Sequence, residues 1–345
     1  MIGTLLRRVA GSAPRLVRRA ALTGGRRRPR VVVALAVVLL LVAVALLSRC
    51  STGPETVRVA AVGDMACDPD DPDFATGAND RCRHQQVSDL AVALNPDALL
   101  GLGDFQYELP TLDAYRTVYG PGFGRLLSRT VPVFGNQEYK VQDANSFTAY
   151  FGKQIKEPTG YWSQELGRWH LVVLNSNCSA VAGGCGKGSP QQTWLDEDLR
   201  NTDRKCVIAA WHHPRWSSGI AGSDSRTADL FRTLYEHRVE LVLSGHDADY
   251  ERFGPLNPDG KKDPLGVRQY VVGTGGQAHY RPGAGDGGRD EHGNLPLGAK
   301  PPAGEFVDFD HHGVLDLELK PDSWSWNFRA VGVDGPLDRG EASCR

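Results

Sequence analysis

The chain has 345 residues, of which 41% are hydrophobic and 23% charged, with a formal net charge of −2 at pH 7. This composition is that of a globular protein, and the length allows one large domain or two small ones. The first thirty residues contain nine arginines and no acidic residue, so the remaining residues carry a formal net charge of −11. An acidic domain lacks the basic footprint that nucleic-acid binding requires, so we expect no nucleic-acid partner.

An apolar segment follows this basic arm of residues 1–30. Residues 31–48 are uncharged and rich in Val, Leu and Ala. At about 1.5 Å per residue, a helix of this length spans roughly 27 Å, close to the hydrocarbon thickness of a bilayer. Arginines before the segment and an acidic chain after it fit the positive-inside rule. We therefore expect a single-pass membrane protein with a cytoplasmic N-terminus and an extracytoplasmic C-terminal domain.

Two alternatives to a membrane anchor start from the same residues. A cleaved signal peptide also begins with a basic arm, but this apolar run is longer than a usual signal-peptide core. Cys50 suits a lipoprotein, but Arg49 stands where such sequences carry a small residue, so we do not expect lipidation. A polar linker at residues 49–56 then leads into a domain expected at 57–345.

Six cysteines lie beyond the apolar segment and its flanking Cys50. They are Cys67, Cys82, Cys178, Cys185, Cys206 and Cys344. An even number in an exported domain indicates disulfides rather than a thiolate metal site. Pairing sequence neighbours joins the first two, the middle two and the last two, although six cysteines permit 15 connectivities.

Apolar runs that end in turn residues alternate with amphipathic stretches, which is typical of an α/β or α+β chain. Strands are expected at residues 57–63, 97–103, 131–135, 169–175, 206–211 and 240–245. Helices are expected at 84–94, 191–199 and 226–237, with Pro190 in a first helical turn. Strands without helices follow at 267–273, 313–319 and 323–330, and the Gly-, Pro- and Asp-rich residues 278–310 are expected to form a loop.

A polar motif follows each of five apolar runs, where strand ends in an open α/β sheet present side chains to a shared crevice. In chain order the motifs are VGDMACD at 62–68, LGDFQYE at 102–108, FGNQEY at 134–139, WHHP at 211–214 and SGHDADYERF at 244–253. Alone, each would be read as a turn or as an ordinary histidine. Together they supply carboxylate, amide and imidazole groups, which are ligands for hard or borderline metal ions.

The order Gly-Asp, Gly-Asp, Gly-Asn, His and Gly-His resembles the calcineurin-like metallophosphoesterases. Tyr107, three residues after Asp104, resembles the purple acid phosphatase branch of that family. The resemblance covers roughly residues 57–330. It implies a four-layer α/β/β/α sandwich of two mixed sheets. It also implies metal-dependent hydrolysis of a phosphate ester, such as a phosphorylated small molecule, at a two-metal site.

The resemblance also implies a ligand for each metal. Asp64 would bind the first metal, Asp104 would bridge both, and Tyr107 could add a phenolate to the first. The second metal would be bound by Asn136, His212 and His246. His213 could replace its neighbour as the ligand, but the pattern of His, one residue and Pro favours His212. The metals would be Fe, Zn or Mn, and Tyr107 favours an iron-containing pair.

Two positions depart from the family pattern. Gln137 stands where most members have a histidine that assists the developing charge or the leaving group; an amide cannot shuttle a proton, although it can donate a hydrogen bond. Ala248 stands where the Gly-His-x-His motif places a ligand to the first metal, so we expect a weak first site unless Asp247 or Asp249 fills the gap. Gln137 and His213 are the candidate catalytic residues.

These departures leave three hypotheses open: an impaired hydrolase, an active enzyme inactivated twice, or a pseudoenzyme that binds a phosphorylated ligand or a protein partner. Phe105 is expected to narrow or shield the cleft, because close relatives carry a small polar residue there. Most of the other histidines are expected to be structural or exposed. His279, after a Gly-Thr-Gly-Gly turn, is the one that could line the cleft.

Overall fold

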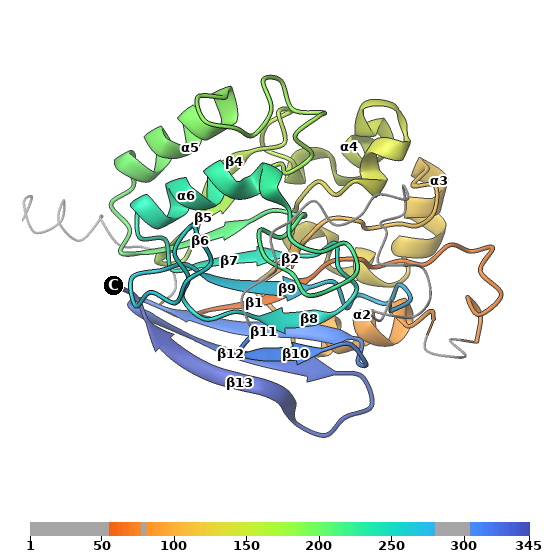
Figure 1. Cartoon of the computed structure of the whole chain (residues 1–345). Coiled ribbons are helices and arrows are strands. Elements are labelled where there is room, and N and C mark those ends of the chain that lie inside the picture. Colours follow the sequence, from red (N-terminus) through yellow and green to blue (C-terminus); the bar gives the residue numbers. More distant parts are fainter. Residues whose placement is uncertain (1–54, 77–80, 280–303) are drawn as a thin grey trace, which may run out of the picture. The chain divides into compact units, whose positions relative to one another are not determined.

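The computed structural model describes residues 55–76, 81–279 and 304–345. Thr52–Arg345 form one compact unit built on two mixed β-sheets (Figure 1). The predicted arm at 1–30, the membrane segment at 31–48 and most of the linker lie outside the described residues. Among the residues that the structure describes, we find no helix with the length and hydropathy of a membrane span.

The first sheet has the strand order β13-β12-β11-β1-β2-β3. Its parallel half comprises β1 (Val57–Val62), β2 (Ala98–Gly101) and β3 (Thr130–Pro132), and its antiparallel half comprises β11 (Gly313–Lys320), β12 (Ser323–Ala330) and β13 (Pro336–Ser343). The parallel strands are almost wholly buried, which explains why they read as continuous apolar runs.

The second sheet has the order β10-β8-β9-β7-β6-β5-β4. Parallel strands β5 (Trp169–Val173), β6 (Cys206–Ala210), β7 (Leu241–Ser244) and β9 (Arg268–Val272) form its centre. At its ends lie β4 (Trp162–Leu166), β8 (Tyr250–Arg252) and β10 (Phe306–Asp308), each antiparallel to the strand it pairs with.

Strand β5 divides two hydrophobic cores. Leu171 and Val173 pack in a core with residues of the first sheet, whereas Val172 and Leu174 pack in a second core with α5 (Pro190–Asn201) and α6 (Ala228–Glu236). This separation follows from the alternation of side chains along a strand. The inner core therefore lies between the two sheets, and the outer core lies under the helices that cover the second sheet.

Helices also cover the first sheet, because α2 (His84–Ala93) buries its apolar face in the inner core set. Residues 112–154 add a series of short helical segments. These are α3 (Leu112–Ala114), η3 (Tyr115–Tyr119), η4 (Phe123–Arg129), η5 (Gln137–Lys140), η6 (Gln142–Ala144), α4 (Asn145–Phe151) and η7 (Gly152–Gln154), and η8 (Ser225–Thr227) precedes α6. The predicted four-layer α/β/β/α sandwich is confirmed.

The helix at α5 shows how local sequence sets an element. The Ser189 hydroxyl accepts a hydrogen bond from the backbone N–H of Gln192 at 3.2 Å, and Pro190 occupies the first turn. The first N–H groups of a helix have no partner within the helix. The serine hydroxyl binds one of them, and proline lacks an N–H altogether. Leu195 and Leu199, four residues apart, then place one apolar face against the second sheet.

The described cysteines form the three predicted disulfides, Cys67–Cys82, Cys178–Cys185 and Cys206–Cys344. The last one has a structural consequence that the sequence did not indicate. Cys206 begins β6 of the second sheet, and Cys344 directly follows β13 of the first. This disulfide therefore ties one sheet to the other.

One predicted segment needs correction. Residues 278–310 were expected to be a loop, but Phe306–Asp308 form β10, which pairs with β8; residues 280–303 lie outside the described part. Three residues are too few to produce a periodic signal. Strands β4, β8 and β13 were also missed: β8 has only three residues, and the edge strands β4 and β13 carry polar residues that hide their alternation.

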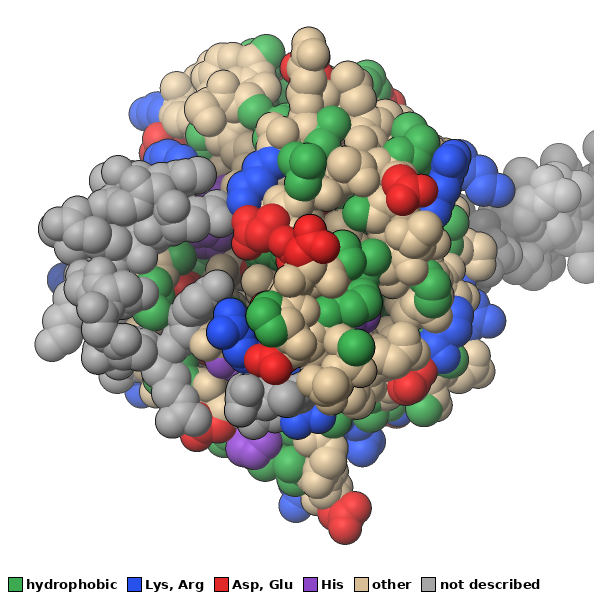
Figure 2. All heavy atoms as spheres, turned by 90° about the vertical axis from the view of Figure 1, so that its right-hand side faces the viewer, with side chains coloured by type: hydrophobic (Ala, Val, Ile, Leu, Met, Phe, Trp, Pro, Cys, Tyr) green, Lys and Arg blue, Asp and Glu red, His purple; other side chains and the backbone are tan. Residues whose placement is uncertain are grey.

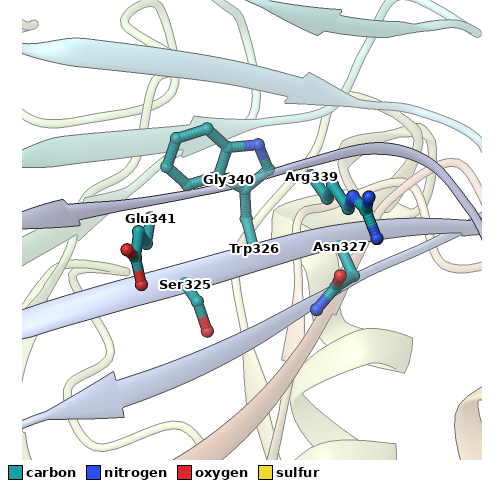
Figure 3. A pocket seen from close by; sticks show the side chains of 6 residues that line it. All are labelled: Ser325, Trp326, Asn327, Arg339, Gly340 and Glu341. Carbon is teal, nitrogen blue, oxygen red and sulfur yellow. The ribbon is translucent and has the colours of Figure 1, made fainter.

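A shallow pocket lies on β12 and β13 at the edge of the first sheet, lined by Ser325, Trp326, Asn327, Arg339, Gly340 and Glu341. Figure 3 shows the polar side chains of β12 pointing to one face and the Trp326 ring to the other. None of these residues belongs to the five motifs.

The cross-sheet disulfide gives a stability prediction. Changing Cys206 and Cys344 to Ala should lower the free energy of unfolding by roughly 5 kcal/mol, because the bridge closes a long loop, with a sequence separation of 138. Changing Cys178 and Cys185 to Ala, with a separation of 7, should cost roughly 2 kcal/mol. Urea unfolding followed by tryptophan fluorescence measures both. Equal losses would contradict the loop-length argument.

Candidate metal centre

Four of the five motifs meet because backbone hydrogen bonds continue beyond the strand ends. After β1 and β2, the N–H of Asp64 donates to Gly103 O at 3.1 Å and that of Met65 to Asp104 O at 2.9 Å. After β6 and β7, the N–H of Gly245 donates to His212 O at 3.1 Å. These contacts place Asp64 beside Asp104 and the two histidine motifs beside each other. Figure 2 shows histidine side chains within a hollow of the surface.

Three of the predicted ligands have a backbone in the left-handed region. The φ angles are 57° at Asp64, 53° at Asp104 and 73° at His246. For residues other than glycine such a conformation costs about 1–3 kcal/mol each and persists only where surrounding contacts impose it. These three residues are therefore held in place by their surroundings and not by backbone preference.

Asp64, Tyr107 and Asp104 form a contiguous set. The Tyr107 hydroxyl lies 2.8 Å from Asp64 Oδ1 and 2.9 Å from Asp104 Oδ2. A phenol has one hydrogen, so one of these contacts needs a proton on a carboxyl group. Burial, together with the charge of Asp104, raises the pKa of Asp64 to about 8, which puts that proton on Asp64. A cation would relieve the same crowding of negative charge, so the set fits a metal ion.

His212 joins this set from β6. Its Nδ1 lies 2.7 Å from the carbonyl oxygen of Leu102 and must donate to it, which leaves Nε2 facing Asn136 Oδ1 at 3.0 Å and Asp104 Oδ2 at 3.3 Å. Burial lowers the pKa of His212, but Asp104 outweighs burial and raises it to about 10. The proton on Nε2 thus occupies the space between three potential ligand atoms. A metal ion that displaced it would gain all three.

Two glycines allow this close packing. A Cβ on Gly103, where φ is +91°, would lie 2.5 Å from His212 Nδ1, and a Cβ on Gly135 would lie 2.1 Å from Asp104 Oδ1. Neither distance is possible for a carbon atom. The glycines of the Gly103-Asp104 and Gly135-Asn136 motifs are therefore required by the predicted ligands that pack against them.

Glu138 holds the backbone around Asp104 in place, a role that the sequence did not indicate. Its carboxylate accepts hydrogen bonds from the backbone N–H groups of Asp104 at 2.9 Å, Phe105 at 3.0 Å and Gly135 at 2.7 Å, and from the Tyr115 hydroxyl at 3.1 Å. Burial raises its pKa to about 7. The only sequence signal for this role was an acidic residue two positions after Asn136. Most of the groups that Glu138 binds are distant from it in sequence.

Three imidazoles lie together at the other side of the centre. The ring centroids of His212, His213 and His246 are 4.4–5.0 Å apart, and one ring nitrogen of each lies within 4.8 Å of the others. Burial lowers the pKa of His246 to about 4 and that of His213 well below its usual range. The structure thus brings both WHHP histidines to the centre.

The departure at Gln137 lies inside the centre. Gln137 is buried, and its backbone N–H donates to Asp104 Oδ1 at 2.9 Å. The residue therefore orients the carboxylate of Asp104 through its main chain. That contact does not depend on the side chain that replaced the histidine.

The departure at Ala248 leaves a gap that Asp247 does not fill. Asp247 accepts hydrogen bonds from the Ser217 hydroxyl and from the N–H groups of Ala221 at 2.7 Å and Gly222 at 3.0 Å, so its carboxylate is held by the 217–222 loop. Within the described ranges, neither carboxylate oxygen of Asp249 has a hydrogen-bond partner. Burial, then Glu251, Asp247 and Asp64, raises its pKa well above the usual range.

Two further residues around the centre were considered from the sequence. Phe105 does not shield the cleft as expected: it is fully buried and packs on Phe151 and Phe147, with ring centroids 4.7 and 5.3 Å away. An aromatic ring gains more from burial than from a polar cleft. His279 contacts the loop after β7, because its Nδ1 is 2.5 Å from the carbonyl oxygen of Ala248.

The chain is similar in sequence to known proteins. The calcineurin-like phosphoesterase family matches residues 57–250. Purple acid phosphatase 21 of Arabidopsis thaliana is 29% identical over 259 residues, which are 67% of this chain and 53% of the relative. Tartrate-resistant acid phosphatase type 5 of Rattus norvegicus is 23% identical over 59% of this chain and 69% of its own. The chain spans about half the length of the plant relative.

Solved structures share the fold. A purple acid phosphatase from yellow lupin seeds matches with a TM-score of 0.59 at 17% identity, over 84% of this chain and 54% of that one. GAP50, described as the anchor in the inner membrane complex of Plasmodium, matches with a TM-score of 0.59 at 14% identity, over 85% of this chain and 90% of that one.

The contacts of Glu138 predict its effect on metal binding. Glu138→Gln replaces an acceptor oxygen by an NH₂ group that faces backbone N–H donors, so the loop carrying Asp104 should shift and zinc affinity should fall about 10- to 100-fold. Isothermal titration calorimetry measures the affinity. The exposed Glu157→Gln is the matched control and should bind zinc as the parent does. A Glu138 variant that also binds like the parent would refute the supporting role.

Proposed function

The chain belongs to the calcineurin-like phosphoesterase family, and on that premise we propose that it hydrolyses phosphate esters at the centre built from Asp64, Asp104 and His212. One observation carries this proposal. The side chains of these residues, delivered by three different strands, converge so closely that their ligand atoms lie within 4.8 Å of one another. Two metal ions at such a centre supply a water of lowered pKa and a clamp on the phosphoryl group.

The two proposed metal sites differ in completeness. The second site has Asp104, Asn136, His212 and His246, whose oxygen and nitrogen atoms fit zinc, iron or manganese. The first has Asp64, Asp104 and Tyr107 but lacks the fourth ligand at Ala248. We therefore expect the second site to bind metal more tightly than the first.

The chain's own groups would hold the centre in its working geometry. The backbone N–H of Gln137 and the phenol of Tyr107 fix the two oxygens of Asp104. The carbonyl of Leu102 fixes the ring of His212 with Nε2 toward the centre. The Gln137 side chain can donate a hydrogen bond to a phosphoryl oxygen but cannot protonate a leaving group, so the proposed activity favours esters with good leaving groups.

We also propose that the domain acts outside the cytoplasm, held at the membrane by residues 31–48. The three disulfides support export, because such bonds persist in oxidising compartments. The arginines before the apolar segment support a cytoplasmic N-terminus.

A second candidate function is binding without catalysis. Gln137 and Ala248 remove an imidazole each from the expected set, and the same fold occurs in GAP50, a protein described as an anchor. In this alternative, the crevice holds a phosphorylated ligand or a protein partner with one metal or none.

One experiment separates these functions. The unit from Thr52 onward is purified, its bound metal is measured by mass spectrometry, and turnover of an aryl phosphate is assayed with added Mn²⁺, Zn²⁺ or iron. Bound metal with turnover that requires it supports the hydrolase. Absence of turnover under every metal would sink the hydrolase and leave the binding function.

The two departures give a mutational prediction. Gln137→His together with Ala248→His should raise the metal content from about one toward two per chain and increase turnover by about 10²- to 10⁴-fold, the usual worth of a general acid. Ala248→His alone should raise metal content with a smaller gain in rate. A double variant with unchanged metal content and rate would show that the residue assignment is wrong.

A further inference from the structure

Ser176 and His213 form a buried pair beside the candidate centre. Ser176 follows β5, and His213 follows β6, which is its parallel neighbour. Two contacts join them: the backbone N–H of His213 donates to Ser176 Oγ at 2.9 Å, and Ser176 Oγ lies 2.8 Å from His213 Nδ1. The hydroxyl is fully buried, and His213 is 5% exposed.

The number of hydrogen atoms shared between Ser176 Oγ and His213 Nδ1 determines the tautomer of His213. The hydroxyl of Ser176 carries one hydrogen, and within the described residues His213 Nδ1 is the acceptor within its reach. If Nδ1 carried a hydrogen instead, Ser176 Oγ would accept twice and its own buried hydrogen would have no acceptor, which is costly. Ser176 therefore donates to Nδ1, and the ring hydrogen of His213 sits on Nε2.

The Nε2 hydrogen is available to a bound molecule. No hydrogen bond from Nε2 to another described residue competes for it, and the His213 ring lies 4.4 Å from that of His246 and 4.9 Å from that of His212. A protonated ring nitrogen has no lone pair for a metal. In this tautomer His213 is therefore a donor next to the centre and not a third imidazole ligand.

We propose that His213 donates a hydrogen bond from Nε2 to an oxygen of the phosphoryl group, and that Ser176 is the positioning residue that fixes this tautomer. This inference rests on the proposed function. It supplies the site with a neutral imidazole N–H after the loss of the histidine at Gln137. The donor keeps its hydrogen, so it stabilises charge on phosphoryl oxygen without transferring a proton.

The tautomer can be read directly in the full chain. Nitrogen-15 labelling of its ten histidines and two-bond nitrogen–proton NMR spectra distinguish Nε2–H from Nδ1–H, and the signal lost in the His213 variants identifies the residue. We expect the Nε2–H form in the parent and a mixture of both forms in Ser176→Ala. An Nδ1–H form in the parent would overturn the proposal.

Binding of inorganic phosphate to the zinc-loaded full chain tests the donor role. His213→Gln can place an amide N–H near the position of Nε2, whereas His213→Asn reaches only the position of Nδ1. We expect phosphate affinity to fall about tenfold or more in His213→Asn and to fall much less in His213→Gln, with zinc content unchanged in both. His237→Asn is the matched control, because His237 hydrogen-bonds Asp196 on the surface, and it should bind as the parent does.

The outcomes separate this inference from the proposed function. Loss of zinc in His213→Asn would make His213 a ligand and overturn the donor role, as would unchanged phosphate affinity in that variant. A parent that binds zinc but no phosphate would overturn the donor role as well. A parent that binds no zinc would defeat the proposed function, and the tautomer measured on the metal-free chain would still decide the pairing of Ser176 with His213.

Discussion

The burial of Asp104 is the constraint on which the site depends. Its carboxylate is 2% exposed, and a buried charge is tolerated only when it is paired and hydrogen-bonded. The chain meets this demand from several elements: a backbone N–H from Gln137, a phenol from Tyr107 and an imidazole from His212. Glu138 holds the main chain of Asp104 in its left-handed conformation.

This arrangement needs two sheets rather than one. Asp64 and Asp104 follow β1 and β2 of the first sheet, while the histidines follow β6 and β7 of the second. The hydrogen bond from His212 Nδ1 to Leu102 O, 110 residues away in sequence, crosses from one sheet to the other. The relative position of the sheets therefore sets the distance between carboxylates and imidazoles. The inner core and the Cys206–Cys344 disulfide hold that position.

The departures from the family pattern change two side chains and leave the main-chain contacts around them in place. Gln137 keeps its main-chain contact with Asp104, and Ala248 keeps a buried place in the loop after β7. The fold also holds two further histidines in place by hydrogen bonds. His213 is fixed by Ser176, and His279 contacts the carbonyl of Ala248. The amide of Gln137 cannot protonate a poor leaving group.

The sequence by itself indicated the fold class, the order of the candidate ligands and the simplest pairing of the cysteines. Apolar runs of strand length indicated an α/β or α+β chain, the order of the five motifs carried the resemblance that implied the four-layer sandwich, and the simplest pairing of the cysteines proved right. Sequence also located the two departures, because they interrupt motifs. It failed at β4, β8, β10 and β13, where a strand is too short or too polar to produce a pattern, and at Phe105, whose ring lies in the core.

Only the tertiary structure decided which side chains share an oxygen or a proton. Glu138 and Ser176 had no motif of their own, since their importance comes from partners that lie on other strands. Asp247 does not fill the gap at Ala248, because the 217–222 loop lies near it and binds its carboxylate. Hydrogen bonds act over about 3 Å, so these roles depend on how the two sheets pack and not on the spacing of residues along the chain.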